Sequence, residues 1–229
     1  MEFWEGFVEA LRMVFTLDST VVEITMRTIL VSGSATLLAM VVGVPIGYAL
    51  ARARFRGRSF ALGAVYTGMG FPPVVVGLFV FLMLVRSGPL GGLELIYTRQ
   101  AMVIAQFIIS VPLVIGFTAA SIQSLPPALG DLLATLGAGR IRTLLLLARE
   151  ARLGLLAAVM AGFGAVISEV GASMTVGGNI AGDTRVLTTA IVLETSRGQN
   201  AQAIALGFIL LAMALAVNLL LTFVQQRPR

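Results

Sequence analysis

The chain has 229 residues, of which 58% are hydrophobic and only 12% are charged, whereas a soluble domain is about half apolar and about a quarter charged. One core of this size cannot bury such an excess, so the composition and the mean hydropathy of +0.97 indicate a membrane protein. The chain has no Cys and no His, and every basic residue is Arg. These absences argue against a zinc or haem enzyme, exclude a GxxxxGK[ST] phosphate loop, and leave no metal site to expect.

The first fifteen residues, MEFWEGFVEALRMVF, have no basic segment and no small-residue cleavage site, so we do not expect a signal peptide. Phe3, Phe7, Leu11 and Val14 recur at helical spacing, and the acidic residues lie elsewhere on the helix. The pattern predicts a helix that lies in the membrane interface. The alternative is a frayed tail packed on the first span.

Five apolar segments are long enough to cross a bilayer, because about 20 helical residues span roughly 30 Å of hydrocarbon. They are residues 29–51, 60–85, 101–121, 153–172 and 204–224. The fold class expected is therefore an all-α integral membrane protein with five transmembrane helices and an N-terminal interfacial helix. We expect it to form a single domain over residues 1–229.

Proline and glycine are frequent inside these segments. The prolines are Pro45, Pro72, Pro73 and Pro112. Each removes a helical hydrogen bond and is expected to kink its helix, which lipid tolerates where neighbouring helices cover the freed carbonyl group. The GxxxG spacing of Gly43 and Gly47 favours close approach of two helices. A mobile bundle around a path and ordinary helix packing both fit this pattern.

The orientation follows from the Arg residues, which stand in short clusters beside apolar runs rather than along a soluble face, so no nucleic-acid partner is expected. If residues 52–58, residues 122–152 and the C-terminus share one side, that side holds ten Arg and the other side six. Positive flanks resist translocation, so the ten-Arg side is expected to be cytoplasmic. The chain is then a multi-pass protein of the cell (inner) membrane with its N-terminus outside and its C-terminus in the cytoplasm.

Residues 122–152, between the third and fourth spans, form a cytoplasmic segment that is neither a short turn nor a domain. Pro126 and Pro127 are predicted to end the third span, and residues 128–136 to form a short helix. Gly137 is predicted to break that helix before a second one begins at residues 141–147. We therefore expect a helix, a glycine turn and a helix on the cytoplasmic surface.

This segment resembles the cytoplasmic loop of permease subunits of ABC importers. The motif of that family has an acidic residue, two small residues, a glycine and an apolar stretch that ends in Leu-Pro. Asp131, Leu136 and Gly137 match it, while two leucines replace the small residues and Arg-Glu replaces Leu-Pro. The resemblance implies that residues 131–142 form a coupling helix in a groove of a separate ATPase subunit. The implied ATPase-coupling residues are Asp131, Leu132, Leu133, Leu136, Gly137, Ala138, Arg140 and Arg142.

A physical argument supports the same role. Four leucines between positions 129 and 136 give a short helix an apolar face that can insert into a groove. Arg140 and Arg142 can then meet acidic groups on the rim. The alternative is an amphipathic stretch that lies on anionic lipid, where Arg residues are also common.

Residues 164–199 resemble a narrower group, the permeases for tetrahedral oxyanions, and especially tungstate permeases. The resemblance rests on SEVGASMTVGGNI and TRVLTTAIVLETSRG. It implies a homodimer of permeases, an extracytoplasmic binding protein that delivers the anion, and two ATPase subunits that carry the ATP and magnesium. The chain itself is then no enzyme and needs no cofactor. Tungstate is the expected substrate, and molybdate or another oxyanion is the alternative.

Residues 173–203 are expected to form an extracytoplasmic loop rich in glycine and in neutral hydrogen-bond donors. A passing anion needs such donors, and weak binding permits its release. The residues assigned to the substrate path or to contact with the binding protein are Ser173, Thr175, Gly177, Gly178 and Asn179. The alternative is a hydrophilic external loop.

Glu169 is the carboxylate that the sequence places near membrane depth, where acidic groups are usually functional. A carboxylate that faced the path would repel a dianion. We therefore expect Glu169 to be structural, bonded to backbone donors or to a buried Arg.

Two other classes of function remain open. A self-sufficient anion channel or secondary carrier is one, although the chain shows no inverted repeat, which would favour a carrier. The other is a membrane scaffold that does not transport.

Overall fold

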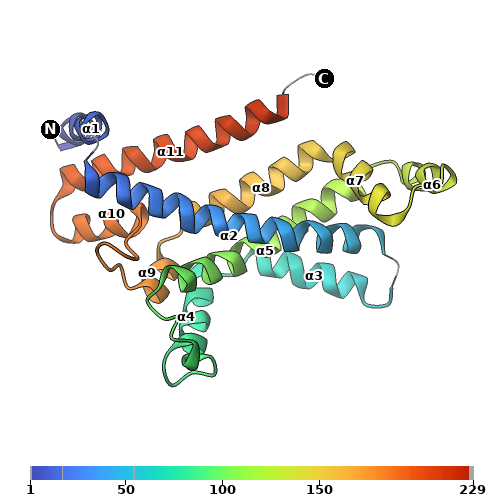
Figure 1. The fold of residues 1–229 in the computed structure, drawn as a ribbon, viewed down its shortest axis with the longest axis horizontal. Coiled ribbons are helices and arrows are strands. Elements are labelled where there is room, and N and C mark those ends of the chain that lie inside the picture. The colour runs from blue at the N-terminus through green and yellow to red at the C-terminus, as the bar shows by residue number, and fades with distance from the viewer. Residues whose placement is uncertain (1, 17, 54, 227–229) are drawn as a thin grey trace.

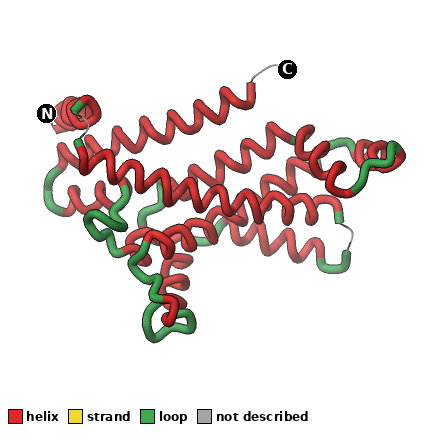
Figure 2. The backbone as a smooth tube through the Cα atoms, in the orientation of Figure 1, coloured by secondary structure: helices red, strands yellow, loops and turns green. Residues whose placement is uncertain are grey.

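The computed structural model describes residues 2–16, 18–53 and 55–226, and all regular structure in these ranges is helical (Figure 2). In chain order the helices are α1 (Glu2–Phe15), α2 (Ser19–Arg52), α3 (Arg58–Met69), α4 (Pro73–Leu84), the 3-10 turn η1 (Gly91–Leu93), α5 (Arg99–Gln123), α6 (Pro127–Thr135), α7 (Arg140–Glu150), α8 (Arg152–Ile167), α9 (Gly171–Gly177), α10 (Leu187–Ser196) and α11 (Asn200–Gln226).

The expected membrane spans correspond to long helices or to bent helix pairs. In the described ranges, α2, α5 and α11 are each long and apolar enough to cross a membrane. Two further pairs qualify together but are bent, α3 with α4 by 99° and α8 with α9 by 59°. The chain therefore has up to five spans by length and composition, and each of the five predicted segments overlaps one of them.

The second and fourth spans are not continuous helices. Between α3 and α4 the chain passes through Pro72 and Pro73, which lack an amide hydrogen and disfavour helix in the preceding residue. By contrast, α2 continues through Pro45 and α5 through Pro112. The break between α8 and α9 contains no proline, and the sequence did not predict it.

Helix α5 lies at the centre of the fold and contacts α2, α3, α4, α8 and α9. Its seam with α2 depends on the GxxxG glycines. A Cβ atom at Gly43 would lie 2.9 Å from Val114 Cγ1, and one at Gly47 would lie 2.7 Å from the Ile115 carbonyl oxygen. The glycines thus permit the close approach that their spacing predicted, and the partner helix belongs to the same chain.

Helix α1 packs mainly on α11. The frayed-tail alternative had placed these residues on the first span instead. The rings of Phe7 and Phe208 meet edge to face with centroids 5.3 Å apart. A Cβ atom at Gly6 would lie only 2.5 Å from Ile204 Cγ2. In Figure 1, α1 is seen end-on while α2 and α11 run lengthwise, so α1 crosses these helices at their N-terminal ends. The predicted N-terminal helix is present.

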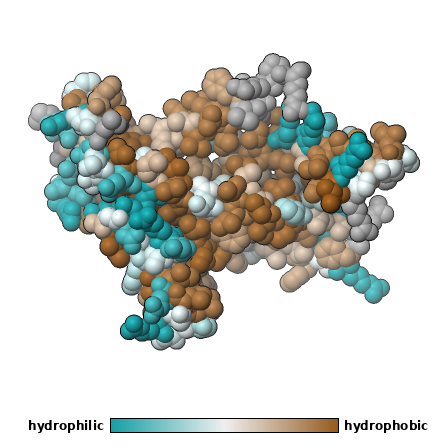
Figure 3. Space-filling view, in the orientation of Figure 1, coloured by the Kyte–Doolittle hydropathy of each residue, from teal (hydrophilic) through white to brown (hydrophobic). Residues whose placement is uncertain are grey.

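Different helices and connections lie at the two ends of the molecule. The α2–α3 connection, α6 and α7 lie at the right-hand end in Figure 1, and α11 runs toward it. Helices α1 and α10 and the start of α2 lie at the opposite end. Figure 3 shows hydrophilic residues gathered at these ends with a hydrophobic band between them. This arrangement is the one expected of a chain that crosses a membrane several times.

Candidate functional site

Helices α6 and α7 form the first candidate site, which we call the α6–α7 hairpin (residues 127–150). Helix α6 ends at Thr135, and Gly137 in the turn that follows has φ of 73°. The Ala138 N–H donates to the Leu133 carbonyl at 3.0 Å, and the Leu136 N–H donates to the Leu132 carbonyl at 3.1 Å. A left-handed glycine with such a bond is a common way to close a helix. The predicted helix, glycine turn and helix are confirmed.

The extent of the predicted coupling helix is wrong. Residues 131–142 do not form one helix, because they contain the second half of α6, the turn at Gly137 and the first residues of α7. The positive φ at Gly137 lies outside the right-handed helical region, so a continuous helix cannot pass through it. The protruding helix is α6, and the residues assigned to coupling are shared between α6, the turn and α7.

The apolar face of α6 is divided between the interior and the surface. Leu129 and Leu133 pack against a buried cluster of Ile122, Leu147 and Ala151. In contrast, Leu132 is 55% exposed and Leu136 is 73% exposed. Two of the four leucines therefore anchor α6, and the other two remain available to a partner.

The other residues assigned to coupling lie in the turn and in α7. Ala138 is half-buried, and Arg142 is exposed. The side chains of Asp131 and Arg140 lie outside the described part of the structure. Helix α7 also exposes Ile141 and Leu145, which the sequence analysis missed because it sought apolar contacts only on the first helix.

The second candidate site comprises α9 and the α9–α10 loop (residues 178–186). Ser173 is fully buried, and its Oγ accepts a hydrogen bond from Gln106 Nε2 of α5 at 3.1 Å. The Thr175 hydroxyl donates to the Gly171 carbonyl within α9 at 2.8 Å. Gly177 packs on Met102, since a Cβ atom there would lie 2.8 Å from the Met102 sulfur.

Gly178 and Asn179 form the turn that follows α9. Both have positive φ, at 69° and 51°. Gly178 lies against the ring of Tyr97, and Asn179 Oδ1 accepts a bond from Arg185 Nε at 3.3 Å. The five residues assigned to the path are thus neighbours along the chain. Their polar side chains bond to groups of the same chain, with Ser173 and Asn179 as acceptors and Thr175 as a donor.

Arg27 holds the α9–α10 loop against α2. Its Nη1 donates to the Arg185 carbonyl at 2.8 Å and its Nη2 to the Gly182 carbonyl at 3.0 Å, and the residue is only 6% exposed. At the exposed side of the loop, Arg99 Nε donates to two oxygens of Asp183, the backbone carbonyl oxygen and the carboxylate Oδ1. Sequence reasoning counted Arg27 only toward topology. Its position next to an apolar run was the available signal.

Glu169 lies in the break between α8 and α9. It is 9% exposed, and its Oε1 accepts the backbone N–H of Ala172 at 2.8 Å. Its carbonyl oxygen accepts the hydroxyl of Thr188 from α10 at 3.0 Å. The backbone donor that the structural interpretation required is therefore present.

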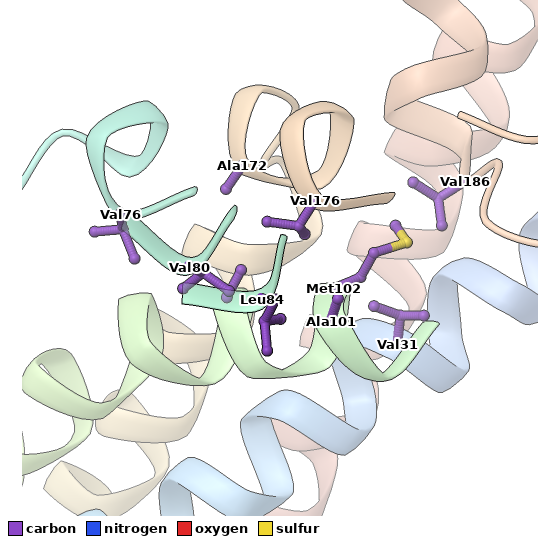
Figure 4. Packing of buried hydrophobic residues seen from close by; sticks show 10 residues of the cluster. Val31, Val76, Val80, Leu84, Ala101, Met102, Ala172, Val176 and Val186 are labelled. Carbon is purple, nitrogen blue, oxygen red and sulfur yellow. The ribbon is translucent and has the colours of Figure 1, made fainter. Parts of the chain in front are cut away.

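A hollow of about 560 Å³ lies where α3 bends into α4 beside Pro112 of α5. Its lining consists of apolar side chains and glycines, including Met69, Phe71 and Ile108. Beyond it, the second halves of both bent pairs pack together, with Val76 and Val80 of α4 in one cluster with residues of α9 (Figure 4). The bend predicted from Pro72 and Pro73 is therefore present, and an apolar hollow lies beside it.

Comparison with known proteins identifies the class. The model of the family described as binding-protein-dependent transport system inner membrane component matches residues 43–229, and the chain belongs to this family. A probable anion ABC transporter permease protein of Haloferax volcanii is 44% identical over 204 residues, which cover 87% of this chain and 88% of that protein. The tungstate uptake system permease protein TupB of Peptoclostridium acidaminophilum is 38% identical over 222 residues, or 97% of each chain.

A solved structure shares the fold. The MetNI methionine ABC transporter in inward-facing conformations has a chain that is similar with a TM-score of 0.68, over 91% of this chain and 94% of that one, at 16% identity. The predicted all-helical fold of an ABC importer permease is confirmed, as is the expectation of a transport subunit rather than an enzyme. Family membership implies an inner-membrane location, and an ATPase and a substrate-binding protein as partners.

Proposed function

We propose that this chain is the membrane-spanning subunit of an ATP-driven importer for a tetrahedral oxyanion, and that the oxyanion is tungstate. The observation that carries the proposal is the likeness to a tungstate uptake permease over 97% of both chains. That likeness includes the α6–α7 hairpin and the α9–α10 loop. Molybdate is a tetrahedral dianion of nearly equal size, so the choice between the two anions is an outcome of the test below.

The subunit works as a homodimer in which two copies face each other across the path. The apolar hollow at the α3–α4 bend supports this arrangement, because it is open to the surface of the single chain, where a second copy can cover it. The described residues that line the hollow include no charged side chain, so a dianion that passes it keeps its hydration shell and is not held there. Lipid covers the outer faces of the spans.

The orientation places the N-terminus and α10 outside and the α6–α7 hairpin in the cytoplasm. The binding protein then delivers the anion at the end that carries the α9–α10 loop. The ten-to-six distribution of Arg supports this orientation, and so does the gathering of the Arg-rich segments toward one end of the fold (Figure 1).

The ATPase subunit receives α6 through the exposed Leu132 and Leu136. ATP and magnesium bind to that partner, whose movement displaces α6. The half-buried Leu129 and Leu133 pass the displacement on, because they share one cluster with Tyr48 of α2, Ile122 of α5 and Leu155 of α8. A packed cluster transmits movement because it cannot be compressed. Movement of α6 thus reaches three spans at their cytoplasmic ends.

Reconstitution tests the proposal directly. The permease, its ATPase and its binding protein are placed in proteoliposomes, and uptake of labelled tungstate is measured with ATP, with a non-hydrolysable analogue, and with molybdate as competitor. We expect uptake that requires ATP, the ATPase and the binding protein. Equal uptake by the permease alone would establish a channel or carrier instead. Preferential uptake of molybdate would reassign the substrate but not the importer.

A further inference from the structure

Arg52, the last residue of α2, lies across Gly130 of α6. A Cβ atom at Gly130 would lie 2.7 Å from Arg52 Cζ and closer still to Nη2. The guanidinium group therefore rests directly on the glycine backbone. Gly130 is buried, although it belongs to a short helix at the tip of the molecule. Only glycine leaves this space open.

The identity of residue 130 follows from this contact rather than from helix formation. Glycine is among the least favourable residues in the interior of a helix. Its neighbours Leu129 and Leu133 are the two leucines that pack inward. Arg52 therefore lies beside the anchoring face of α6, while Leu132 and Leu136 project from the exposed face.

The end of α2 is itself firmly held. Arg58 Nε donates to the Leu50 carbonyl at 2.7 Å and Arg58 Nη2 donates to the Ala51 carbonyl at 3.3 Å, so the final carbonyls of α2 have a partner. Tyr48 and Ala51 join the same apolar cluster as the inner leucines of α6. Arg52 thus extends from a fixed helix end onto a helix that is joined to the fold by few contacts.

We propose that Arg52 is a positioning residue. Its contact with Gly130, which we call the seat, sets the position of α6 against the end of α2, so that movement of α6 is passed to α2. The inference rests on the proposed function, in which α6 engages the ATPase. Arg is suited to the task because its planar guanidinium can lie flat on a backbone surface, whereas the ammonium of Lys cannot. Loss of the seat lowers the transport obtained per ATP and leaves hydrolysis in place.

Two single variants and their double variant test the inference in the reconstituted complex. Gly130→Ala fills the seat, and because the atoms it displaces are the flexible end of Arg52, it spares the fold. Arg52→Ala removes the guanidinium and adds no atom, so the inference stays testable if Gly130→Ala lowers abundance. The matched controls are Gly63→Ala in α3, where a Cβ meets nothing within 4 Å, and Arg56→Ala in the connection that follows Arg52.

The readouts are tungstate uptake and ATP hydrolysis, each normalised to permease in the membrane. We expect each single variant to lower uptake per ATP by about fivefold, the lower end of typical coupling between sites. The double variant should be no worse than either single one, because both remove the same contact. The controls should match the unaltered protein.

Unaltered uptake per ATP in both single variants would overturn the inference, and so would a double variant whose loss is the product of the single losses. Leu136→Asp is measured in parallel to separate this result from the proposed function. If Leu136→Asp abolishes uptake while Gly130→Ala and Arg52→Ala do not change it, only the role of Arg52 fails. If Leu136→Asp also transports normally, the engagement of α6 by the ATPase fails.

Discussion

The Glu169 side chain accepts the backbone N–H of Ala172 at 2.8 Å, three residues farther along the chain. This bond satisfies a buried donor at the start of α9, just after the bend from α8. The carboxylate is thus aimed at its own backbone. The geometry supports a structural role, because the carboxylate stabilises the first turn of α9.

Substitutions at Glu169 distinguish a structural role of this carboxylate from a position in the lining of the anion path. Glu169→Gln keeps an oxygen acceptor, so uptake should largely survive. Glu169→Ala leaves the Ala172 N–H without its partner, at a cost of about 1–3 kcal/mol, and should lower both permease abundance and uptake. The measurement is labelled tungstate uptake normalised to permease in the membrane. Faster normalised uptake by Glu169→Gln would show that the carboxylate repels the anion and lines the path.

The hairpin turn gives the second prediction. Gly137→Val forces a β-branched residue into positive φ, which costs roughly 1–2 kcal/mol and misplaces the turn after α6. Leu136→Asp puts a charge on a side chain that is largely exposed in the isolated chain, so its effect arises only in the groove of the ATPase. Both variants should abolish ATP-driven uptake while the permease still inserts and dimerises. Gly139→Ala, with open space around its Cβ, is the control that should transport normally.

The sequence predicts those parts of the fold that local chemistry determines. Uninterrupted apolar runs identify α2, α5 and α11, and Pro127 and Gly137 locate the start and end of α6. The break between α8 and α9 escapes prediction because no proline marks it. The contacts found there are the Glu169 bond within the chain and the Thr188 bond from α10.

The candidate sites are predicted less well because they depend on contacts between distant residues. Four leucines at helical spacing do not reveal which two face inward on α6, and Arg52, far back in the sequence, lies beside the inward face. Likewise, the sequence assigns Ser173 to the path, yet the residue is fully buried and its oxygen accepts a bond from Gln106 of another helix. Spacing along a chain identifies a segment, and tertiary contacts decide which of its side chains are exposed.

Topology is the third prediction, and the absence of Cys makes it simple to test. Ser59→Cys, near the start of α3, and Ser87→Cys, after α4, are conservative changes at exposed positions. A membrane-impermeant maleimide added to intact cells should label Ser87→Cys at once. Ser59→Cys should react only after the membrane is permeabilised, because the Arg-rich flank is held in the cytoplasm. The reverse pattern would invert the orientation.

The α2–α5 seam supplies the fourth prediction, with a matched pair of glycines on one helix. Gly47→Ala places a Cβ atom 2.7 Å from a backbone oxygen and should cost about 1–3 kcal/mol through overpacking. Gly33→Ala meets nothing within 4 Å and should stabilise α2 by about 0.5–1 kcal/mol. Thermal unfolding of the detergent-solubilised permease should therefore give a lower Tm for Gly47→Ala and an equal or higher one for Gly33→Ala. Equal losses at both positions would show that the seam is not closely packed.

The last prediction concerns the hold of Arg27 on the α9–α10 loop. Arg27→Met leaves the carbonyls of Gly182 and Arg185 without the donors that they have now. Hydrogen bonds to charged groups contribute about 1.5–3 kcal/mol each, so the open form of the loop should become at least roughly tenfold more populated. Limited trypsin digestion of the solubilised permease reports this opening as faster cleavage after Arg185. Arg27→Lys keeps the charge but has a single nitrogen, so its rate of cleavage after Arg185 should lie between those of Arg27→Met and the unaltered chain. Arg12→Met, on the exposed side of α1, should be cleaved after Arg185 at the unaltered rate. Cleavage after Arg185 at the same rate in Arg27→Met and in the unaltered chain would mean that other contacts, such as the Arg99–Asp183 pair, hold the loop by themselves.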